Sequence, residues 1–90
     1  MADLRPGQRN ILDTVAKKTN RSVSWSVTDT VIVQACEDNN NIPAEEAYSH
    51  LLQLEGLNLI KIGVKASGAD FRMISITKEG LEESSKNQQL

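Results

Sequence analysis

The sequence contains one cysteine, Cys36, and one histidine, His50, so these are the only residues that could form a thiol–imidazole catalytic pair. Cys36 lies on the apolar stripe of an expected helix, together with Ile32 and Ala35, and a thiol in that position is predicted to be buried and inert. A nucleophilic enzyme is therefore not expected.

Metal and phosphate chemistry are not expected either. Asp38 begins an acidic and amide-rich run that resembles the start of a calcium loop, but Pro43 stands at the sixth position, where such a loop needs glycine. The run is instead predicted to be a helix–helix turn. A phosphate-binding glycine loop is also absent, because the glycines at 56, 63, 68 and 80 are isolated. We expect no metal, no cofactor and no enzymatic activity.

Charge is strongly segregated along the chain, although the net charge is only −2. Residues 5–27 and 57–78 are basic, whereas residues 28–56 contain six carboxylates and no Lys or Arg. Each block on its own is compatible with a solvated surface. A DNA duplex would attract the second basic block and repel the acidic block.

The length of 90 residues predicts a single domain, placed at residues 1–83. With 39% hydrophobic and 24% charged residues, the chain is too apolar to be disordered. Aromatic residues are only 3%, which argues against a binding surface of stacked aromatic rings. A single thiol, no signal-like start and no long apolar run indicate a cytoplasmic protein without a membrane span.

The first half of the chain predicts a helix, a short strand and a second helix. The first helix is expected over 6–19, because apolar residues recur there at helical spacing. Residues 22–27 alternate polar and apolar, which predicts a strand with Val23, Trp25 and Val27 on one face. Ser26 or Thr28 would cap the next helix. The β-branched residues 31–33 make a strand the rival interpretation there, but their failure to alternate favours a helix.

The second half predicts a turn at 38–41, a third helix from about Pro43, and a β-hairpin. The third helix would place Ala44, Ala47, Tyr48, Leu51 and Leu54 near one stripe. The hairpin would pair 57–64 with 71–76 around a polar turn at 65–70. Thr77 would cap a short last helix ending at Leu81, and residues 84–90 are expected to form a frayed tail.

Three segments, in this order and spacing, resemble the winged helix–turn–helix superfamily over roughly residues 6–83. Residues 11–16 are similar to the first helix of such domains, residues 42–55 to the turn and recognition helix, and residues 76–81 to the strand-to-helix ending of MarR-like and PadR-like regulators. Asn58 stands where the family usually has glycine, and asparagine tolerates positive φ. The resemblance implies an α+β fold with a three-helix core, a C-terminal β-hairpin wing and a short last helix.

The resemblance also implies binding to double-stranded DNA as a transcriptional regulator, with the third helix in the major groove and the wing on phosphates. Hydrogen bonds to bases would come from Ser49, His50 and Gln53. Phosphate contacts would come from Lys61, Lys65 and Arg72. Many members of the superfamily are homodimers, which doubles the number of contacts. The alternative without a DNA partner is that these side chains form only the solvent-exposed side of an amphipathic helix and keep the hairpin soluble.

An acidic third helix conflicts with DNA binding, because phosphates are normally met by Lys or Arg. This conflict leads to a second hypothesis, in which the helix–turn–helix binds a basic protein instead of DNA. The acidic face would then consist of Glu37, Asp38, Glu45 and Glu46. Glu45 and Glu46 also complement the dipole of their helix, which explains them without any partner.

Overall fold

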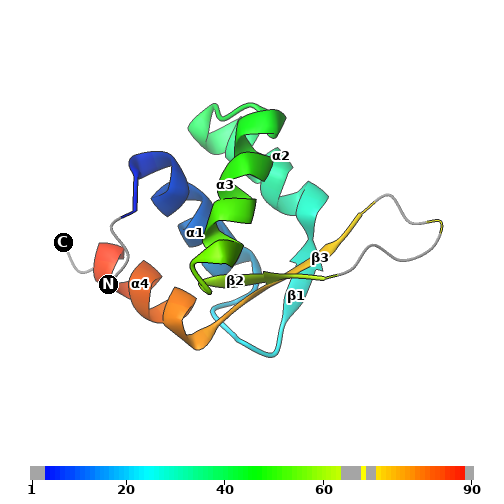
Figure 1. Cartoon of the computed structure of the whole chain (residues 1–90). Helices are drawn as coiled ribbons and strands as arrows, with labels where there is room; N and C mark the ends of the chain where they lie inside the picture. The colour runs from blue at the N-terminus through cyan, green and yellow to red at the C-terminus, as the bar shows by residue number, and fades with distance from the viewer. Residues whose placement is uncertain (1–3, 64–67, 69–70, 89–90) are drawn as a thin grey trace.

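The computed structural model describes residues 4–63, 68 and 71–88 of the chain. Its elements confirm the predicted order and the α+β class (Figure 1). In chain order they are α1 (Pro6–Lys18), β1 (Ser26–Thr28), α2 (Asp29–Asn40), α3 (Ala44–Gly56), β2 (Ile60–Ile62), β3 (Met73–Ile76) and α4 (Lys78–Gln88).

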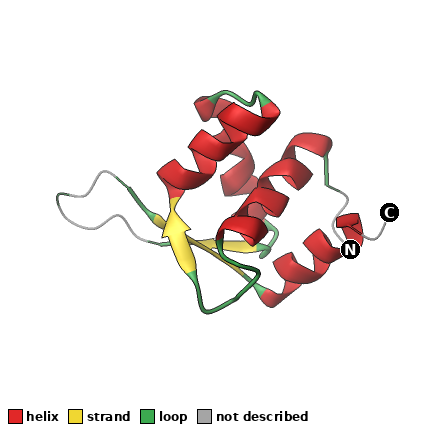
Figure 2. Cartoon of the chain, turned by 180° about the vertical axis from the view of Figure 1, so that it is seen from behind, coloured by secondary structure: helices red, strands yellow, loops and turns green. Residues whose placement is uncertain are grey.

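The core forms where α1, α2 and α3 pack against one another, and α4 packs against α1 (Figures 1 and 2). Apolar residues at helical spacing give each helix one buried stripe. Burial of each large aliphatic side chain contributes about 1.5–3 kcal/mol, so these stripes dominate the stability of the domain. The fully enclosed members include Ile11, Leu12, Val15, Ile32, Cys36, Ala47, Leu51 and Leu54.

The three short strands form an antiparallel sheet in the order β1-β3-β2. Ile74 of β3 lies between Val27 of β1 and Ile62 of β2, and all three side chains pack on the helical core. The neighbouring register position pairs Lys61 with Ser75 on the outer face, because successive side chains alternate across a sheet. The pairing of β2 with β3 confirms the predicted hairpin, while most of its predicted turn, including Lys65, lies outside the described residues.

The predicted strand at 22–27 is wrong in its extent, because β1 begins only at Ser26. Val23 and Trp25 lie before it and are both more than half exposed. A turn in which the Trp25 N–H donates to the Ser22 carbonyl at 3.4 Å occupies residues that the pattern assigned to a strand. Alternation alone cannot distinguish such a loop from an edge strand.

The helical prediction for residues 31–36 is confirmed by α2. Its N-cap residue is Thr28, the alternative prediction, so the predicted capping box at Ser26 is wrong. The Thr28 hydroxyl makes no capping hydrogen bond to the helix and is hydrogen bonded to the Thr30 hydroxyl at 2.9 Å. Val31 is exposed rather than part of the core stripe. The predicted turn at 38–41 also begins too early, because α2 continues to Asn40 and ends at Asn41 in the left-handed conformation.

Helix α3 starts at Ala44, close to the predicted position, but Ala44 and Tyr48 of its predicted stripe are exposed. Both strands of the hairpin are shorter than predicted. Asn58 has φ of 63°, which agrees with the positive φ expected at this position.

Helix α4 is longer than predicted. Thr77 caps it as expected, since the Gly80 N–H donates to Thr77 Oγ1 at 3.0 Å. The helix then continues to Gln88, so the expected tail is wrong for residues 84–88. Ser84 is completely buried and donates to Asp13 Oδ1 at 2.8 Å, which attaches α4 to α1. No helix among the described residues has the length and apolarity needed to span a bilayer.

Candidate nucleic-acid interface

The outward side of α3 is weakly polar and contains no cation. Ser49 is exposed there, and Leu52 beside it is 59% exposed. Glu45 and Glu46 are exposed in the first turn of the helix. The helix therefore offers one hydroxyl and an apolar side chain at its centre. Its two carboxylates lie at the N-terminal end, which is the end that contacts bases in helix–turn–helix proteins bound to DNA.

Two of the residues predicted to contact bases, His50 and Gln53, also contact α1. The Gln8 Nε2 group donates to Gln53 Oε1 at 2.6 Å, and His50 Nδ1 lies 3.3 Å from the same oxygen. The His50 ring also packs over Gly7 so closely that a Cβ atom there would lie 2.8 Å from Nε2. His50 and Gln53 thus contact the start of α1, although Gln53, like Ser49, remains exposed.

The basic residues of the hairpin occupy different surfaces. Arg72 precedes β3, is exposed, and lies on the side that faces α3. Lys61 is exposed on the outer face of the sheet, where it lines a shallow hollow with Val23 and Lys78. Lys65 lies outside the described residues. Of the predicted phosphate-binding residues that the structure describes, only Arg72 lies beside α3.

An acidic cluster of four carboxylates lies at the tip of the helix–turn–helix, where α2 and α3 are connected. Glu37 and Asp38 lie near the end of α2 and are exposed, as are Glu45 and Glu46 at the start of α3. The short turn between the two helices brings these ends together (Figure 1). Asp38 accepts a hydrogen bond of 3.0 Å from Gln34 Nε2 within α2.

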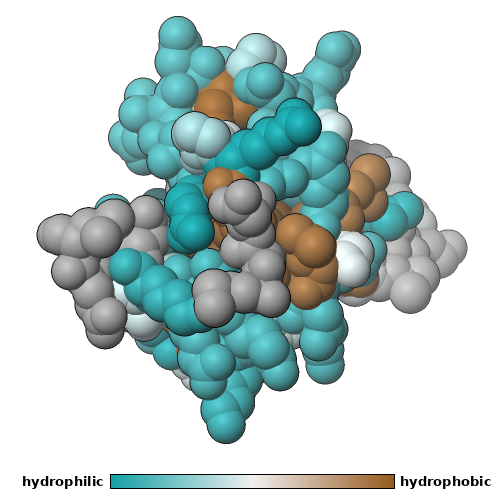
Figure 3. Space-filling view, turned by 60° about the vertical axis from the view of Figure 1, so that its left-hand side comes forward, coloured by the Kyte–Doolittle hydropathy of each residue, from teal (hydrophilic) through white to brown (hydrophobic). Residues whose placement is uncertain are grey.

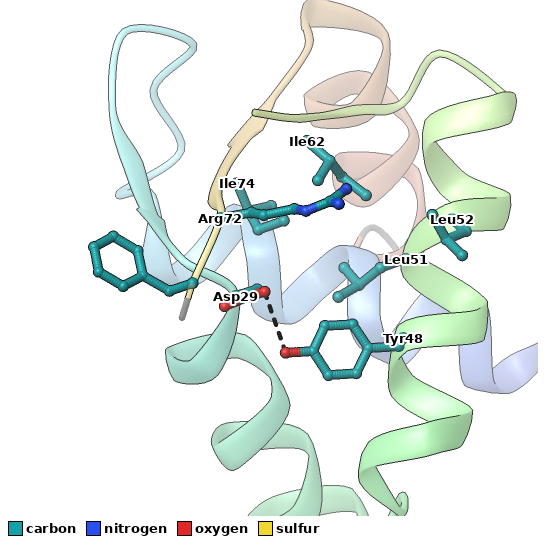
Figure 4. A pocket seen from close by; sticks show the side chains of 8 residues that line it. Asp29, Tyr48, Leu51, Leu52, Ile62, Arg72 and Ile74 are labelled. Atoms are coloured by element: carbon teal, nitrogen blue, oxygen red, sulfur yellow. Dashed lines mark hydrogen bonds between the residues drawn. The ribbon is translucent and has the colours of Figure 1, made fainter. Parts of the chain in front are cut away.

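A pocket of about 300 Å³ lies between α3, the start of α2 and the two strands of the hairpin (Figure 4). Its wall is mainly apolar, and its polar groups come from Asp29, Tyr48 and Arg72. The Tyr48 hydroxyl donates to Asp29 Oδ2 at 3.1 Å, and the Asp29 backbone N–H donates to the Arg72 carbonyl at 2.9 Å. Asp29 therefore connects α2 both to α3 and to the hairpin. The apolar part of the wall is formed by Leu51, Leu52, Ile62, Phe71 and Ile74.

Sequence analysis missed Asp29 as a functional candidate. It stands at the first position of a helix, where a carboxylate is expected to complement the helix dipole and stay in water. In the structure it is only 5% exposed, and its Oδ1 atom is buried without a hydrogen-bond partner among the described residues. Partial burial, followed by the charge of Asp29 and the hydrogen bond to it, raises the pKa of Tyr48. The phenol therefore keeps its proton and remains the donor.

Exposed apolar side chains on the visible face are divided into separate patches among hydrophilic ones (Figure 3). Such scattered exposure is ordinary for a small domain. No group of three or more His, Cys, Asp or Glu residues in the described part of the chain is arranged to hold a metal ion.

No protein-family model matches the sequence, and no curated protein matches it. Solved structures do match. RosR from H. salinarum superposes with a TM-score of 0.74 at 17% identity, over 97% of this chain and 73% of RosR. A variant of ZitR from Lactococcus lactis superposes with a TM-score of 0.69 at 17% identity, over 98% of this chain. An E. coli MarR variant in complex with operator DNA superposes with a TM-score of 0.71 at 11% identity, also over 98% of this chain.

These superpositions define the class: the chain has a winged helix–turn–helix fold. Within that class it is similar to MarR-like regulators, as the resemblance in the sequence indicated. The chain spans only 53% of ZitR and 56% of the operator-bound MarR, so the similarity covers about half of those proteins.

Proposed function

We propose that this protein is a winged-helix transcriptional regulator that binds duplex DNA in the cytoplasm, with α3 in the major groove and the hairpin on phosphates. The main support is that nearly the whole chain superposes on a MarR variant whose structure contains operator DNA. Another similar structure is that of a zinc-responsive member of the MarR family, and we propose a non-enzymatic role.

In this proposal the residues of α3 have two roles. Ser49, which is exposed at the centre of the outward side, contacts a base or a phosphate. Gln53 and His50 hold α3 against α1 through Gln8 and Gly7 and so set the angle at which the helix enters the groove. Each of them still has a polar edge from which it can reach DNA once the helix is in place.

The hairpin supplies the positive charge that α3 lacks. In the proposal, Arg72 contacts phosphate beside α3, and Lys61 contributes from the outer face of the sheet. Lys65, which lies outside the described residues, is proposed to add a further phosphate contact. With so few cations in each copy, binding by a monomer is expected to be weak and strongly reduced by salt. A homodimer doubles the contacts and gives the symmetry that a palindromic site requires.

Fluorescence anisotropy with random-sequence duplex DNA at low and moderate salt tests this proposal. Arg72→Gln should weaken binding and lower the slope of log K against log salt by about one, because one phosphate contact is lost. Arg21→Gln is the matched control, since Arg21 is an exposed cation in the turn after α1, and it should leave both values unchanged. Absence of binding by the folded protein at low salt would contradict the proposal.

The oligomeric state is tested separately by size-exclusion chromatography with light scattering. A dimer at the concentrations used for DNA binding supports recognition of a palindrome. A monomer at high concentration would remove that part of the proposal while leaving single-site DNA binding to the anisotropy experiment.

A basic protein partner is the second candidate, and the acidic cluster at the tip of α2 and α3 favours it. The double change Glu45→Lys and Glu46→Lys should abolish capture of such a partner in a pull-down, because it reverses the charge of the surface. Glu79→Lys, an exposed change in the first turn of α4, is the control for altered net charge. If DNA binding is instead strengthened by the double change and no partner is lost, this second candidate is wrong.

A further inference from the structure

The pocket between α3 and the hairpin contains a buried carboxylate whose charge is not balanced by a cation. Asp29 is 5% exposed, and among the described residues neither Lys nor Arg forms an ion pair with it. The Tyr48 hydroxyl satisfies Oδ2, while Oδ1 is buried without a partner. A buried carboxylate is strongly stabilised by a nearby positive charge that also donates hydrogen bonds.

The rest of the wall would fit an apolar body. Leu51 and Leu52 come from α3, Ile62 and Ile74 come from the sheet, and Tyr48 extends from α3 toward Asp29 (Figure 4). The face of an aromatic ring attracts cations, so Tyr48 favours the same charge as Asp29 does. The volume of about 300 Å³ has the size of a small ligand site.

We propose that this pocket binds a small organic cation, an amidinium- or guanidinium-type group on a flat apolar body. The cation would lie against the Asp29 carboxylate and the Tyr48 ring, and its apolar body would contact Leu52 and Ile62. The proposal concerns the chain alone and does not depend on DNA binding.

Arg72 is the feature that opposes a cation in this pocket. Its guanidinium extends along the wall toward Ile62, away from Asp29, and the residue is exposed (Figure 4). An exposed arginine can turn into water at little cost, so it weakens the site without blocking it. Arg72→Gln should therefore strengthen binding of the cation by about twofold, the size of a screened charge interaction.

Three probes of nearly equal size but different charge test the proposal: benzamidine as its cation, benzamide and benzoate. Each is titrated into the isotope-labelled full chain and followed by NMR. Benzamidinium should bind with shifts centred on Asp29, Tyr48 and Leu52, benzamide should bind at least about tenfold more weakly, and benzoate should not bind there. Equal binding by the three probes, or shifts centred elsewhere, would overturn the proposal.

Variants confirm which groups are responsible. Asp29→Asn keeps the shape of the side chain and should weaken benzamidinium binding by about tenfold or more. Glu82→Gln removes one exposed carboxylate on α4, which does not line the pocket, and should change nothing. If Asp29→Asn does not fold, Leu52→Ala serves instead, because Leu52 is largely exposed, and it should weaken binding by about fivefold. Unchanged affinity in the folded Asp29 variant, or in Leu52→Ala, would overturn the proposal.

Discussion

The Tyr48 hydroxyl and the Asp29 carboxylate form a 3.1 Å hydrogen bond that joins α3 to the first residue of α2. The two residues are far enough apart in the sequence that the helix–turn–helix must be folded before they meet. The bond also forms one side of the pocket beside the hairpin, so it affects both the stability of the motif and the shape of its binding surface.

Removal of this hydrogen bond should destabilise the domain. Tyr48→Phe leaves the ring in place but takes away the donor to a buried carboxylate, which is expected to cost about 1–2 kcal/mol in the free energy of unfolding. Urea denaturation measures the change. Asp38→Asn serves as the control, and its effect should stay within about 0.5 kcal/mol because Asp38 is exposed. A Tyr48→Phe protein as stable as wild type would show that the bond contributes nothing.

Tyr48 should ionise above the ordinary tyrosine pKa of about 10. Burial is the largest cause of this raised pKa, and the negative charge of Asp29 and the hydrogen bond to it add to the effect. Because the folded state holds the proton more tightly than the unfolded state, this stabilisation is fully present below about pH 10 and is lost as the pH rises through the folded pKa. Tyr48 is the only tyrosine, so ultraviolet absorbance of the phenolate measures its titration directly.

The same titration on Asp29→Asn provides the comparison. Loss of the negative charge should move the midpoint toward the ordinary tyrosine value, although burial keeps it somewhat raised. A midpoint that does not move would mean that burial alone sets the pKa of Tyr48.

Gly80 lies where the start of α4 meets the loop before β2, and there is no room for a side chain. A Cβ atom at this position would overlap the Leu59 carbonyl group and press on Ile76. Gly80→Ala should therefore destabilise the domain by about 2 kcal/mol or more in thermal or urea unfolding. Gly56→Ala is the matched control, because a Cβ at Gly56, the last residue of α3, has no neighbour within 4 Å. The control should be neutral or slightly stabilising.

The attachment of α4 to α1 is tested by two adjacent serines. Ser84 is fully buried and donates to Asp13, whereas Ser85 is exposed. Ser84→Ala should lower the free energy of unfolding by about 1 kcal/mol through loss of the hydrogen bond, and Ser85→Ala should have almost no effect. Equal effects of the two changes would indicate that the end of α4 is not held against α1.

The order of the elements, the three-helix core and the paired hairpin could all be predicted from the sequence. Each of these depends on local periodicity: Ile11 to Ala16 recur at helical spacing, and residues 73–76 alternate as a half-buried strand does. Asn58 was also predictable, because its need for positive φ is set by the chain immediately around it. The boundaries were less accurate, since strand ends depend on which residues find a partner strand.

The contacts that each polar side chain makes could not be predicted, because they depend on tertiary packing. Helical spacing places Ser49, His50 and Gln53 off the apolar stripe, but the packing of α1 turns the last two toward Gln8 and Gly7 and leaves Ser49 outward. The burial of Ser84 and of Asp29 depends in the same way on helices and strands distant in sequence. Periodicity specifies one face of each helix, whereas the surroundings of a polar side chain depend on every element that packs beside it.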